Sequence, residues 1–204
     1  MADIAGKRLG PRFRGDERIH LCSAPLPMIA NLITSVRLVL LVPLFVLASG
    51  AEPGMRWAGL GVFLLAGATD VLDGHVARRL GEVSKGGALL DLVADRLLTL
   101  VAVTAVAAAG ALPGPWLVAG VALVGRDLVV ASLNEALPGQ LDIRVSPLER
   151  VKIALQFAGL GLLITPLAAG HDIGRMALAA AAALAGVAVL DYVRRAIRRI
   201  KNMA

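Results

Sequence analysis

The chain alternates between long apolar stretches and short connections rich in polar or helix-breaking residues. Six stretches are apolar almost all round for about 20 residues, the length an α-helix needs to cross a bilayer. They cover residues 28–49, 57–78, 87–110, 115–136, 149–168 and 174–196. Proline and glycine mark the connections at 51–54, 112–115 and 137–139, and Gly170-His171-Asp172-Ile173 reads as another. The pattern predicts an all-α integral membrane protein, a bundle of six transmembrane helices.

Composition supports this fold class. The apolar fraction is 57%, against about 45–50% in an ordinary soluble domain, and the mean hydropathy is +0.76. The aromatic content of 3% is too low for a surface that stacks bases, so we expect no nucleic-acid partner. The single cysteine, Cys22, excludes an intrachain disulfide. The first 20 residues lack an apolar segment, so no cleaved signal peptide is expected.

Basic residues predict the orientation in the membrane. The net charge is +6, and the cations cluster at the two ends of the chain. These clusters are Lys7, Arg8, Arg12, Arg14 and Arg18 at the start, and Arg194, Arg195, Arg198, Arg199 and Lys201 at the end. Six spans put both termini on one side, which the positive-inside rule makes cytoplasmic, next to anionic membrane lipids. We therefore divide the chain into a basic N-terminal juxtamembrane segment, 1–27, and a six-helix domain, 28–204.

Four aspartates interrupt the apolar pattern where the second span ends and the third begins. Asp70 and Asp73 are three residues apart and Asp91 and Asp95 four apart, so each pair lies on one helix face. The short link at 79–86 should make the two helices antiparallel neighbours, with all four carboxylates near the cytoplasmic surface. Such a cluster needs a cation, and oxygen ligands suit Mg²⁺, Mn²⁺ or Ca²⁺. An ion or proton pathway is an alternative of a different class.

Small residues flank these aspartates. Gly74 and Ala77 accompany the first pair, and Gly87 lies one turn before the second. They leave a patch without side chains, where a bulky, flat or phosphorylated ligand can lie against the backbone, and Arg78 adds a cation for a phosphate. A proton relay needs no such clearance, so the pattern favours a ligand-binding site.

Written out, the motif is Asp70-x₂-Asp73-Gly74-x₂-Ala77-Arg78-x₈-Gly87-x₃-Asp91-x₃-Asp95. It resembles the motif of the CDP-alcohol phosphotransferase family at every defined position and spacing, and that family's six-helix fold would cover about residues 25–200. The resemblance implies a homodimer with a polar active-site cavity on the cytoplasmic side. It also implies transfer of a phosphatidyl group from CDP-diacylglycerol to an alcohol, with release of CMP.

The resemblance implies a role for each motif residue. The metal-site residues would be Asp70, Asp73, Asp91 and Asp95, holding a pair of Mg²⁺ or Mn²⁺ ions. Asp95 would also be the catalytic base on the acceptor hydroxyl. Residues for the CDP group would be Gly74, Ala77, Arg78 and Gly87. The implied chemistry is coherent, because a metal pair can neutralise a pyrophosphate and a nearby carboxylate can take the hydroxyl proton.

The start of the first span resembles the Pro-Asn-x-Leu-Thr-x-x-Arg opening of bacterial phosphatidylglycerophosphate synthases and the related cardiolipin synthases. Asn31, Thr34 and Arg37 match, whereas Ala30 stands in place of the proline. Thr34 and Arg37 are three residues apart and share a helix face. The resemblance adds Asn31, Thr34 and Arg37 to the CDP-binding set.

Polar residues of the fourth and fifth spans predict the acceptor site. They resemble the Gly-Arg-Glu/Asp and Lys-x-Lys-Thr-x-x-x-Gln segments of phosphatidylglycerophosphate synthases. The matched residues are Arg126, Arg150, Lys152 and Gln156, which would form a basic pocket for an acceptor phosphate. Ile153 replaces the threonine, Arg150 replaces the first lysine, and Glu149 adds a negative charge. A structural alternative is that Asp127 simply neutralises Arg126.

The favoured acceptor is glycerol 3-phosphate, which would give phosphatidylglycerophosphate. Phosphatidylglycerol, as in a cardiolipin synthase, and an inositol phosphate, as in a phosphatidylinositol phosphate synthase, are alternatives. A cation or proton transporter is the alternative of another class. The expected location is the bacterial cytoplasmic membrane.

Overall fold

The structure, a computed structural model, describes the backbone of residues 28–80, 85–136 and 147–203, and the side chains of residues 34–69, 87, 90–132 and 148–189. The predicted basic segment 1–27 lies outside the described residues. The described chain forms six helices, which confirms the all-α fold class. They are α1 (Met28–Ala48), α2 (Pro53–Leu80), α3 (Lys85–Ala108), α4 (Pro115–Ala136), α5 (Pro147–Ile164) and α6 (Ala168–Met203).

Local sequence explains where these helices start and stop. Three of them begin on a proline, whose fixed φ suits the first helical position and whose missing N–H removes an unsatisfied donor. Helix α3 ends in a Schellman motif. Gly110 adopts a φ of 71°, its N–H donates to the oxygen of Ala107, and the N–H of Ala111 donates to the oxygen of Val106.

One predicted connection is wrong. Gly170–Ile173 lies inside α6, and the break between α5 and α6 falls at residues 165–167. Pro166 has no N–H to continue a helix, so α5 ends before it. Similarly, α2 already begins at Pro53, within the stretch 51–56 that was expected to be a loop.

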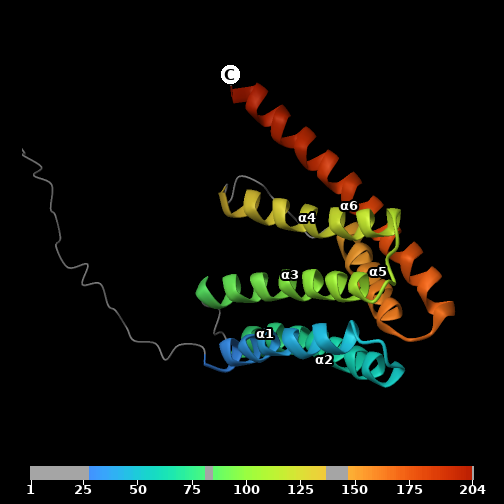
Figure 1. Cartoon of the computed structure of the whole chain (residues 1–204). Coiled ribbons are helices and arrows are strands. Elements are labelled where there is room, and N and C mark those ends of the chain that lie inside the picture. The colour runs from blue at the N-terminus through green and yellow to red at the C-terminus, as the bar shows by residue number, and fades with distance from the viewer. Residues whose placement is uncertain (1–27, 81–84, 137–146, 204) are drawn as a thin grey trace, which may run out of the picture.

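The helices run alternately in opposite directions (Figure 1). Helices α1 and α3 begin, and α2 and α4 end, on the left of that view, which we call the site end. Helix α1 packs along both α2 and α3, whereas α2 and α3 contact each other over a smaller area. The two helices that carry the aspartates are therefore antiparallel, as predicted, but α1 is the main neighbour of both.

All six helices contribute to one apolar core. Its fully buried side chains include Leu44, Phe63, Val106, Leu123, Leu160 and Leu178, one from each helix. Helices α5 and α6 approach most closely at Gly174, where an added Cβ would lie 2.9 Å from the backbone oxygen of Gly159. The rings of Phe63 in α2 and Phe157 in α5 stack with centroids 4.4 Å apart.

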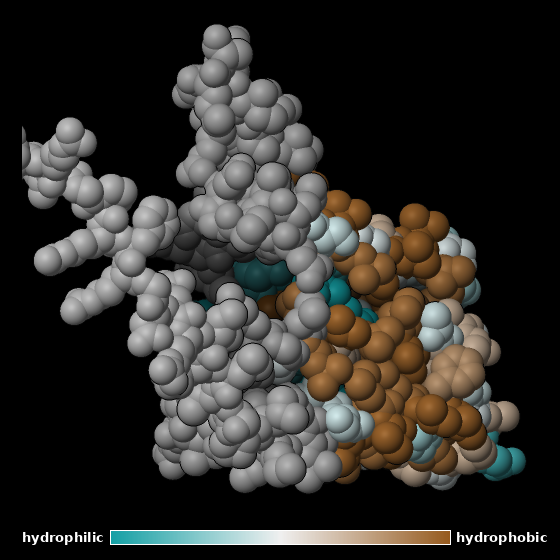
Figure 2. Space-filling model, turned by 90° about the vertical axis from the view of Figure 1, so that its left-hand side faces the viewer, coloured by the Kyte–Doolittle hydropathy of each residue, from teal (hydrophilic) through white to brown (hydrophobic). Residues whose placement is uncertain are grey.

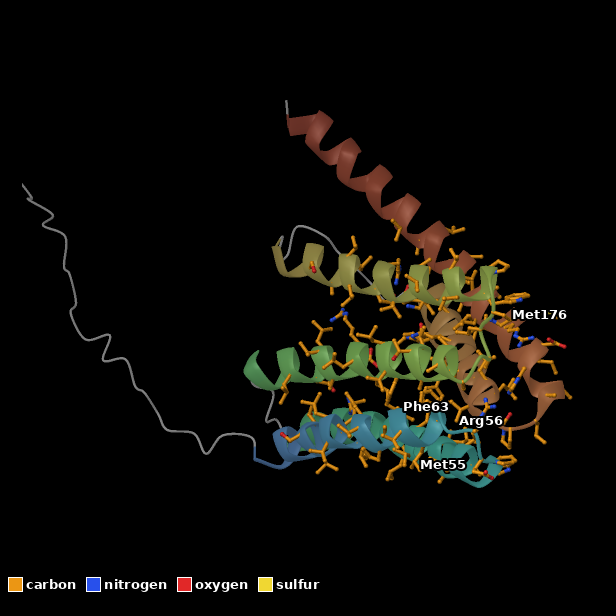
Figure 3. The ribbon with its side chains drawn as sticks, viewed as in Figure 1. Met55, Arg56, Phe63 and Met176 are labelled. Carbon is orange, nitrogen blue, oxygen red and sulfur yellow. The ribbon has the colours of Figure 1, made fainter. Side chains whose placement is uncertain are left out.

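An arginine closes the end of the bundle that lies opposite the site end. Arg56 in α2 points to the C-terminus of α5 (Figure 3). Its Nε donates to the oxygen of Ile164 at 3.1 Å and its Nη2 to that of Leu163 at 2.7 Å. These are carbonyl groups that a helix leaves without an internal partner at its end, so Arg56 serves as a cap supplied by a neighbouring helix.

Much of the outer surface of the described helices is apolar. Large hydrophobic side chains are exposed on several helices, such as Val39 and Val42 in α1 and Val118 in α4, each about 70% exposed. Two spans, Pro115–Ser132 and Ala168–Val189, are long and apolar enough to cross a membrane, and only 22% of either is buried in the fold. That low burial distinguishes them from the core helices of a soluble protein.

Candidate functional site

An acidic face of α3 lies near its start, at the site end. Asp91 and Asp95 are four residues apart in this helix and share a face. The Asp91 side chain is 47% exposed, and Asp95 is also exposed. Two of the predicted metal-site residues thus present carboxylates at a solvent-accessible surface.

A fully buried arginine from α1 contacts this face. Nη1 of Arg37 donates to Oδ1 of Asp91 at 3.1 Å, and Arg37 itself is 0% exposed. Thr34, one turn earlier in α1, is buried as well. The structure therefore brings a residue predicted for the CDP group into contact with a residue predicted for the metal.

The other motif positions are helical, but their side chains lie outside the described residues. Asp70, Asp73, Gly74, Ala77 and Arg78 belong to the last turns of α2, and Asn31 belongs to the first turn of α1. Gly87 is in the first turn of α3 and partly exposed. The helical backbone bears out the spacing argument, because residues three apart in α2 share a face. Among the side chains that the structure describes, no three acidic, histidine or cysteine groups gather as a metal site would.

A second group of charged side chains joins α4 to α5. We call it the α4–α5 ion network, and its members are Arg126, Asp127, Glu149 and Lys152. The guanidinium of Arg126 is bidentate on Glu149, at 2.9 and 3.2 Å, and donates to Asp127 at 2.9 Å. The ammonium of Lys152 lies 2.8 and 3.0 Å from the two oxygens of Asp127 and 3.2 Å from Glu149.

This network balances two cations with two carboxylates. The side chains of Arg126 and Lys152 are 13% and 4% exposed, and buried charges persist only when they are well paired. The predicted alternative, a pair between Asp127 and Arg126, is confirmed. Among the described residues, the charges of Arg126 and Lys152 in the predicted basic pocket are thus balanced by those of Asp127 and Glu149. Arg150, in contrast, is exposed and joins no ion pair with the described side chains.

Two contacts connect α3 to α4 and α5 close to the network. Nε of Arg96 donates to the backbone oxygen of Asp127 at 3.3 Å, and Nε2 of Gln156 donates to Oγ1 of Thr99 at 3.0 Å. The sequence analysis missed Arg96 and Thr99. The signal for Arg96 was present, because an arginine inside an apolar span is expensive and should face the bundle interior. Thr99 had no such signal, since threonine is common in membrane helices.

The surface at the site end fits this description. Figure 2 views the molecule from the left of Figure 1 and shows hydrophilic atoms among the described residues at this end, next to a largely hydrophobic surface. Polar groups inside the bundle and apolar groups outside are the arrangement of a membrane protein that admits a polar ligand at one end.

The fold and the site define an all-helical, membrane-associated protein whose described charged side chains gather toward one end of its bundle. The chain belongs to the CDP-alcohol phosphatidyltransferase family, whose model matches residues 27–190. The matched region includes every residue of the acidic face and of the ion network. The resemblance seen in the sequence motif is thereby confirmed, and the protein is a phosphatidyltransferase of this family.

Individual relatives agree. The chain is 34% identical over 177 residues to a probable phosphatidylglycerophosphate synthase of Mycobacterium tuberculosis, covering 84% of this chain and 83% of the relative. It is 44% identical over 110 residues to a CDP-diacylglycerol–glycerol-3-phosphate 3-phosphatidyltransferase of Pseudomonas fluorescens, covering 52% and 54%. A CMP-forming cardiolipin synthase of rice is 30% identical over 171 residues, covering 76% and 52%.

Proposed function

We propose that the protein transfers the phosphatidyl group of CDP-diacylglycerol to glycerol 3-phosphate, forming phosphatidylglycerophosphate and releasing CMP. The observation that carries the proposal is the placement of the acidic face of α3 beside the buried cations Arg126 and Lys152. The acidic face can hold the metal ions that the donor pyrophosphate needs, and the two cations can bind an acceptor phosphate. The names of the relatives from Mycobacterium and Pseudomonas support the same acceptor.

The acidic residues fit a divalent metal. Carboxylate oxygens are the ligands that Mg²⁺ and Mn²⁺ prefer. Arg37 contacts one oxygen of Asp91, and because the side chain is half-exposed the carboxylate can still reach a ligand. In the proposal Asp70, Asp73, Asp91 and Asp95 hold two such ions. When bound, the ions neutralise the pyrophosphate and stabilise the departing CMP.

The CDP group lies against α1, α2 and α3 in this proposal. Arg37 and Thr34 form one wall, with Asn31 before them in the same helix. The small residues Gly74, Ala77 and Gly87 let the nucleotide approach the helix backbones, and Arg78 supplies a cation to its phosphates. A rigid arginine fork suits this task, since it matches phosphate geometry.

Asp95 is the general base. It is exposed on the face of α3 one turn beyond Asp91, so an acceptor hydroxyl can reach it. The carboxylate takes the hydroxyl proton as the oxygen attacks the phosphorus of the phosphatidyl group. The new oxygen–phosphorus bond forms while the bond to the oxygen of the CMP phosphate breaks, and CMP leaves with the electron pair.

Arg126 and Lys152 hold the acceptor phosphate, with Gln156 one turn deeper in α5 and Arg150 at the exposed rim. Both buried cations are already paired with carboxylates, so a phosphate has to compete with Glu149 and Asp127. A second candidate acceptor is phosphatidylglycerol, because the rice cardiolipin synthase aligns with 76% of this chain.

The proposal also orients the protein. The site end faces the cytoplasm, with all six helices crossing the membrane and both termini inside. The lipid tails of the donor then stay in the bilayer while a water-soluble acceptor enters from the cytosol. As in the family that the motif resembles, the working unit is a homodimer.

The test is CMP release by purified protein from CDP-diacylglycerol with Mg²⁺ or Mn²⁺. Glycerol 3-phosphate, phosphatidylglycerol and inositol phosphate are offered separately, each with an EDTA control. We expect release with glycerol 3-phosphate alone and its loss in EDTA. Release only with phosphatidylglycerol would identify a cardiolipin synthase, and ion flux in liposomes without CMP release would favour a transporter.

A further inference from the structure

Gln156 carries a buried oxygen that the described structure leaves without a hydrogen bond. The residue is 8% exposed, and its Oε1 has no partner, whereas its Nε2 donates to Thr99. Buried polar atoms without partners are rare, and leaving one unpaired destabilises the fold. An apolar side chain would pack at this position without that penalty. The unpaired oxygen therefore suggests that a ligand donates a hydrogen bond to Gln156.

Thr99 determines which end of the Gln156 amide remains unpaired. A threonine hydroxyl has one proton, and that of Thr99 is directed to the backbone oxygen of Asp95 at 3.4 Å. Oγ1 of Thr99 must therefore accept a hydrogen bond from Gln156, and only the amide NH₂ can donate one. The amide oxygen, an acceptor, is then the end of the side chain that is left without a partner.

The pair lies one helical turn deeper in the bundle than the two groups that flank the acceptor in the proposed function. Thr99 is one turn beyond Asp95 in α3, and Gln156 is one turn beyond Lys152 in α5. An acceptor that reaches both Asp95 and Lys152 therefore passes close to the amide. The reacting hydroxyl of the acceptor is assigned to Asp95, and its phosphate to Arg126 and Lys152. The unpaired oxygen of Gln156 therefore suits a second hydroxyl of the acceptor.

We propose that Thr99 is a positioning residue that orients Gln156 so that Oε1 accepts a hydrogen bond from a non-reacting hydroxyl of the acceptor. This inference rests on the proposed function and gives the site a means of recognising a polyol phosphate. Discrimination of this kind is effective because an acceptor without the hydroxyl leaves the amide oxygen unpaired.

The test compares glycerol 3-phosphate with 3-hydroxypropyl phosphate, which keeps the phosphate and a primary hydroxyl but lacks the secondary hydroxyl. CMP release is measured with both acceptors for the wild type, Thr99→Val and Thr99→Ser. We expect the wild type to have a KM for glycerol 3-phosphate about three- to tenfold lower than for the analogue, the effect of one hydrogen bond. Thr99→Val should raise the KM for glycerol 3-phosphate to that of the analogue, while kcat changes less than about twofold. Thr99→Ser keeps the hydroxyl and should therefore retain the low KM for glycerol 3-phosphate.

Thr104→Val is the matched control. Thr104 is exposed in the same helix, and its hydroxyl donates only to backbone oxygens of its own helix, at 2.9 Å. This variant should keep the wild-type ratio of the two KM values, and thermal unfolding of all variants checks their fold.

The outcomes separate the two claims. An active wild type whose KM values are unchanged in Thr99→Val overturns the inference alone. A Thr99→Val variant whose KM rises equally for both acceptors also overturns it, because Thr99 would then support the helix packing only. A wild type that releases no CMP with glycerol 3-phosphate overturns the proposed function, and the inference falls with it.

Discussion

Arg37 is the largest side chain that the described fold buries completely. Its guanidinium is nevertheless paired with a carboxylate. Its contact with Asp91 ties α1 to the acidic face of α3. A buried guanidinium is tolerated when an anion pairs with it, and a half-exposed carboxylate is such an anion that stays available to a ligand. Through this single residue, α1 forms part of the candidate site as well as part of the core.

Asp95→Asn tests the proposed base. The amide keeps the shape of the carboxylate but cannot take a proton, so kcat should fall by about 10²- to 10⁴-fold. Binding of CDP-diacylglycerol, measured without acceptor, should remain detectable. Asp172→Asn is the control, because Asp172 is an exposed acid in α6 whose partner is Arg175. Normal turnover by Asp95→Asn would remove Asp95 from this role.

Glu149→Gln tests the competition for the acceptor cations. Glu149 contacts both Arg126 and Lys152, and removing its charge leaves them freer to hold a phosphate. A partly exposed ion pair contributes about 1 kcal/mol or less, so the KM for glycerol 3-phosphate should fall by up to about fivefold. Glu52→Gln, an exposed position outside the site, should change nothing. A higher KM in Glu149→Gln would instead mean that Glu149 holds Arg126 in place for the acceptor.

Most of the candidate site could be predicted from the sequence, and the reason is chemical. Charged residues in apolar helices are few. Because burying a charge in a membrane costs free energy, such a residue is expected to have a function or an ion-pair partner. That logic identified Asp91 and Arg126, whereas Lys152 was predicted from the resemblance to phosphatidylglycerophosphate synthases. The pair between Asp127 and Arg126 was an open alternative, but the pairs of Arg126 with Glu149 and of Lys152 with Asp127 could not be predicted, because pairing between α4 and α5 depends on helix rotation. Nor could that logic predict Thr99, whose role comes from the residue facing it.

At the scale of elements, the apolar pattern predicted all six helices but not their packing. Gly170 and Asp172 resembled a turn, yet both lie in α6, since the helix break is set by Pro166 instead. The position of α1 between α2 and α3 had no sequence signal. Apolar side chains pack equally well against any apolar neighbour, so the partners of a membrane helix are decided by local shape.

Gly67→Ala tests one such shape. A Cβ at Gly67 in α2 would overlap the ring of Phe157 in α5, and that ring cannot turn aside easily because it stacks on Phe63. Overpacking should cost about 1–3 kcal/mol and lower Tm by about 3–10 °C.

The matched control is Gly61→Ala. Gly61 is an exposed glycine of the same helix with no atom within 4 Å of an added Cβ, so the Tm of the Gly61→Ala variant should not fall, because alanine is the better helix former. Phe157→Leu in the Gly67→Ala background should recover part of the loss. If Gly67→Ala unfolds at the wild-type temperature, α2 and α5 are not in the rigid contact described here.

At the scale of the whole molecule, the described part of the fold combines an apolar core with an apolar outer surface and a few buried charges. Exposed valines cover the outside of α1 and α4, whereas the arginine and lysine of α4 and α5 lie inside. A lipid environment favours this arrangement because the buried charges of the described side chains have partners and the apolar faces can meet acyl chains. The helices also alternate in direction (Figure 1), so the site and the connections of α1 to α2 and α3 to α4 lie at opposite ends.

That alternation makes the orientation testable with the single native cysteine. If the site end is cytoplasmic, a membrane-impermeant maleimide should label Cys22 in inside-out vesicles of a bacterial host but not in intact cells. In a Cys22→Ser, Glu52→Cys variant the pattern should reverse, because Glu52 is exposed in the connection between α1 and α2. Both proteins must still release CMP for the labels to report on the native fold. The opposite labelling pattern would place the site outside, away from cytosolic glycerol 3-phosphate. Labelling of both positions from the same side would mean that α1 does not cross the membrane.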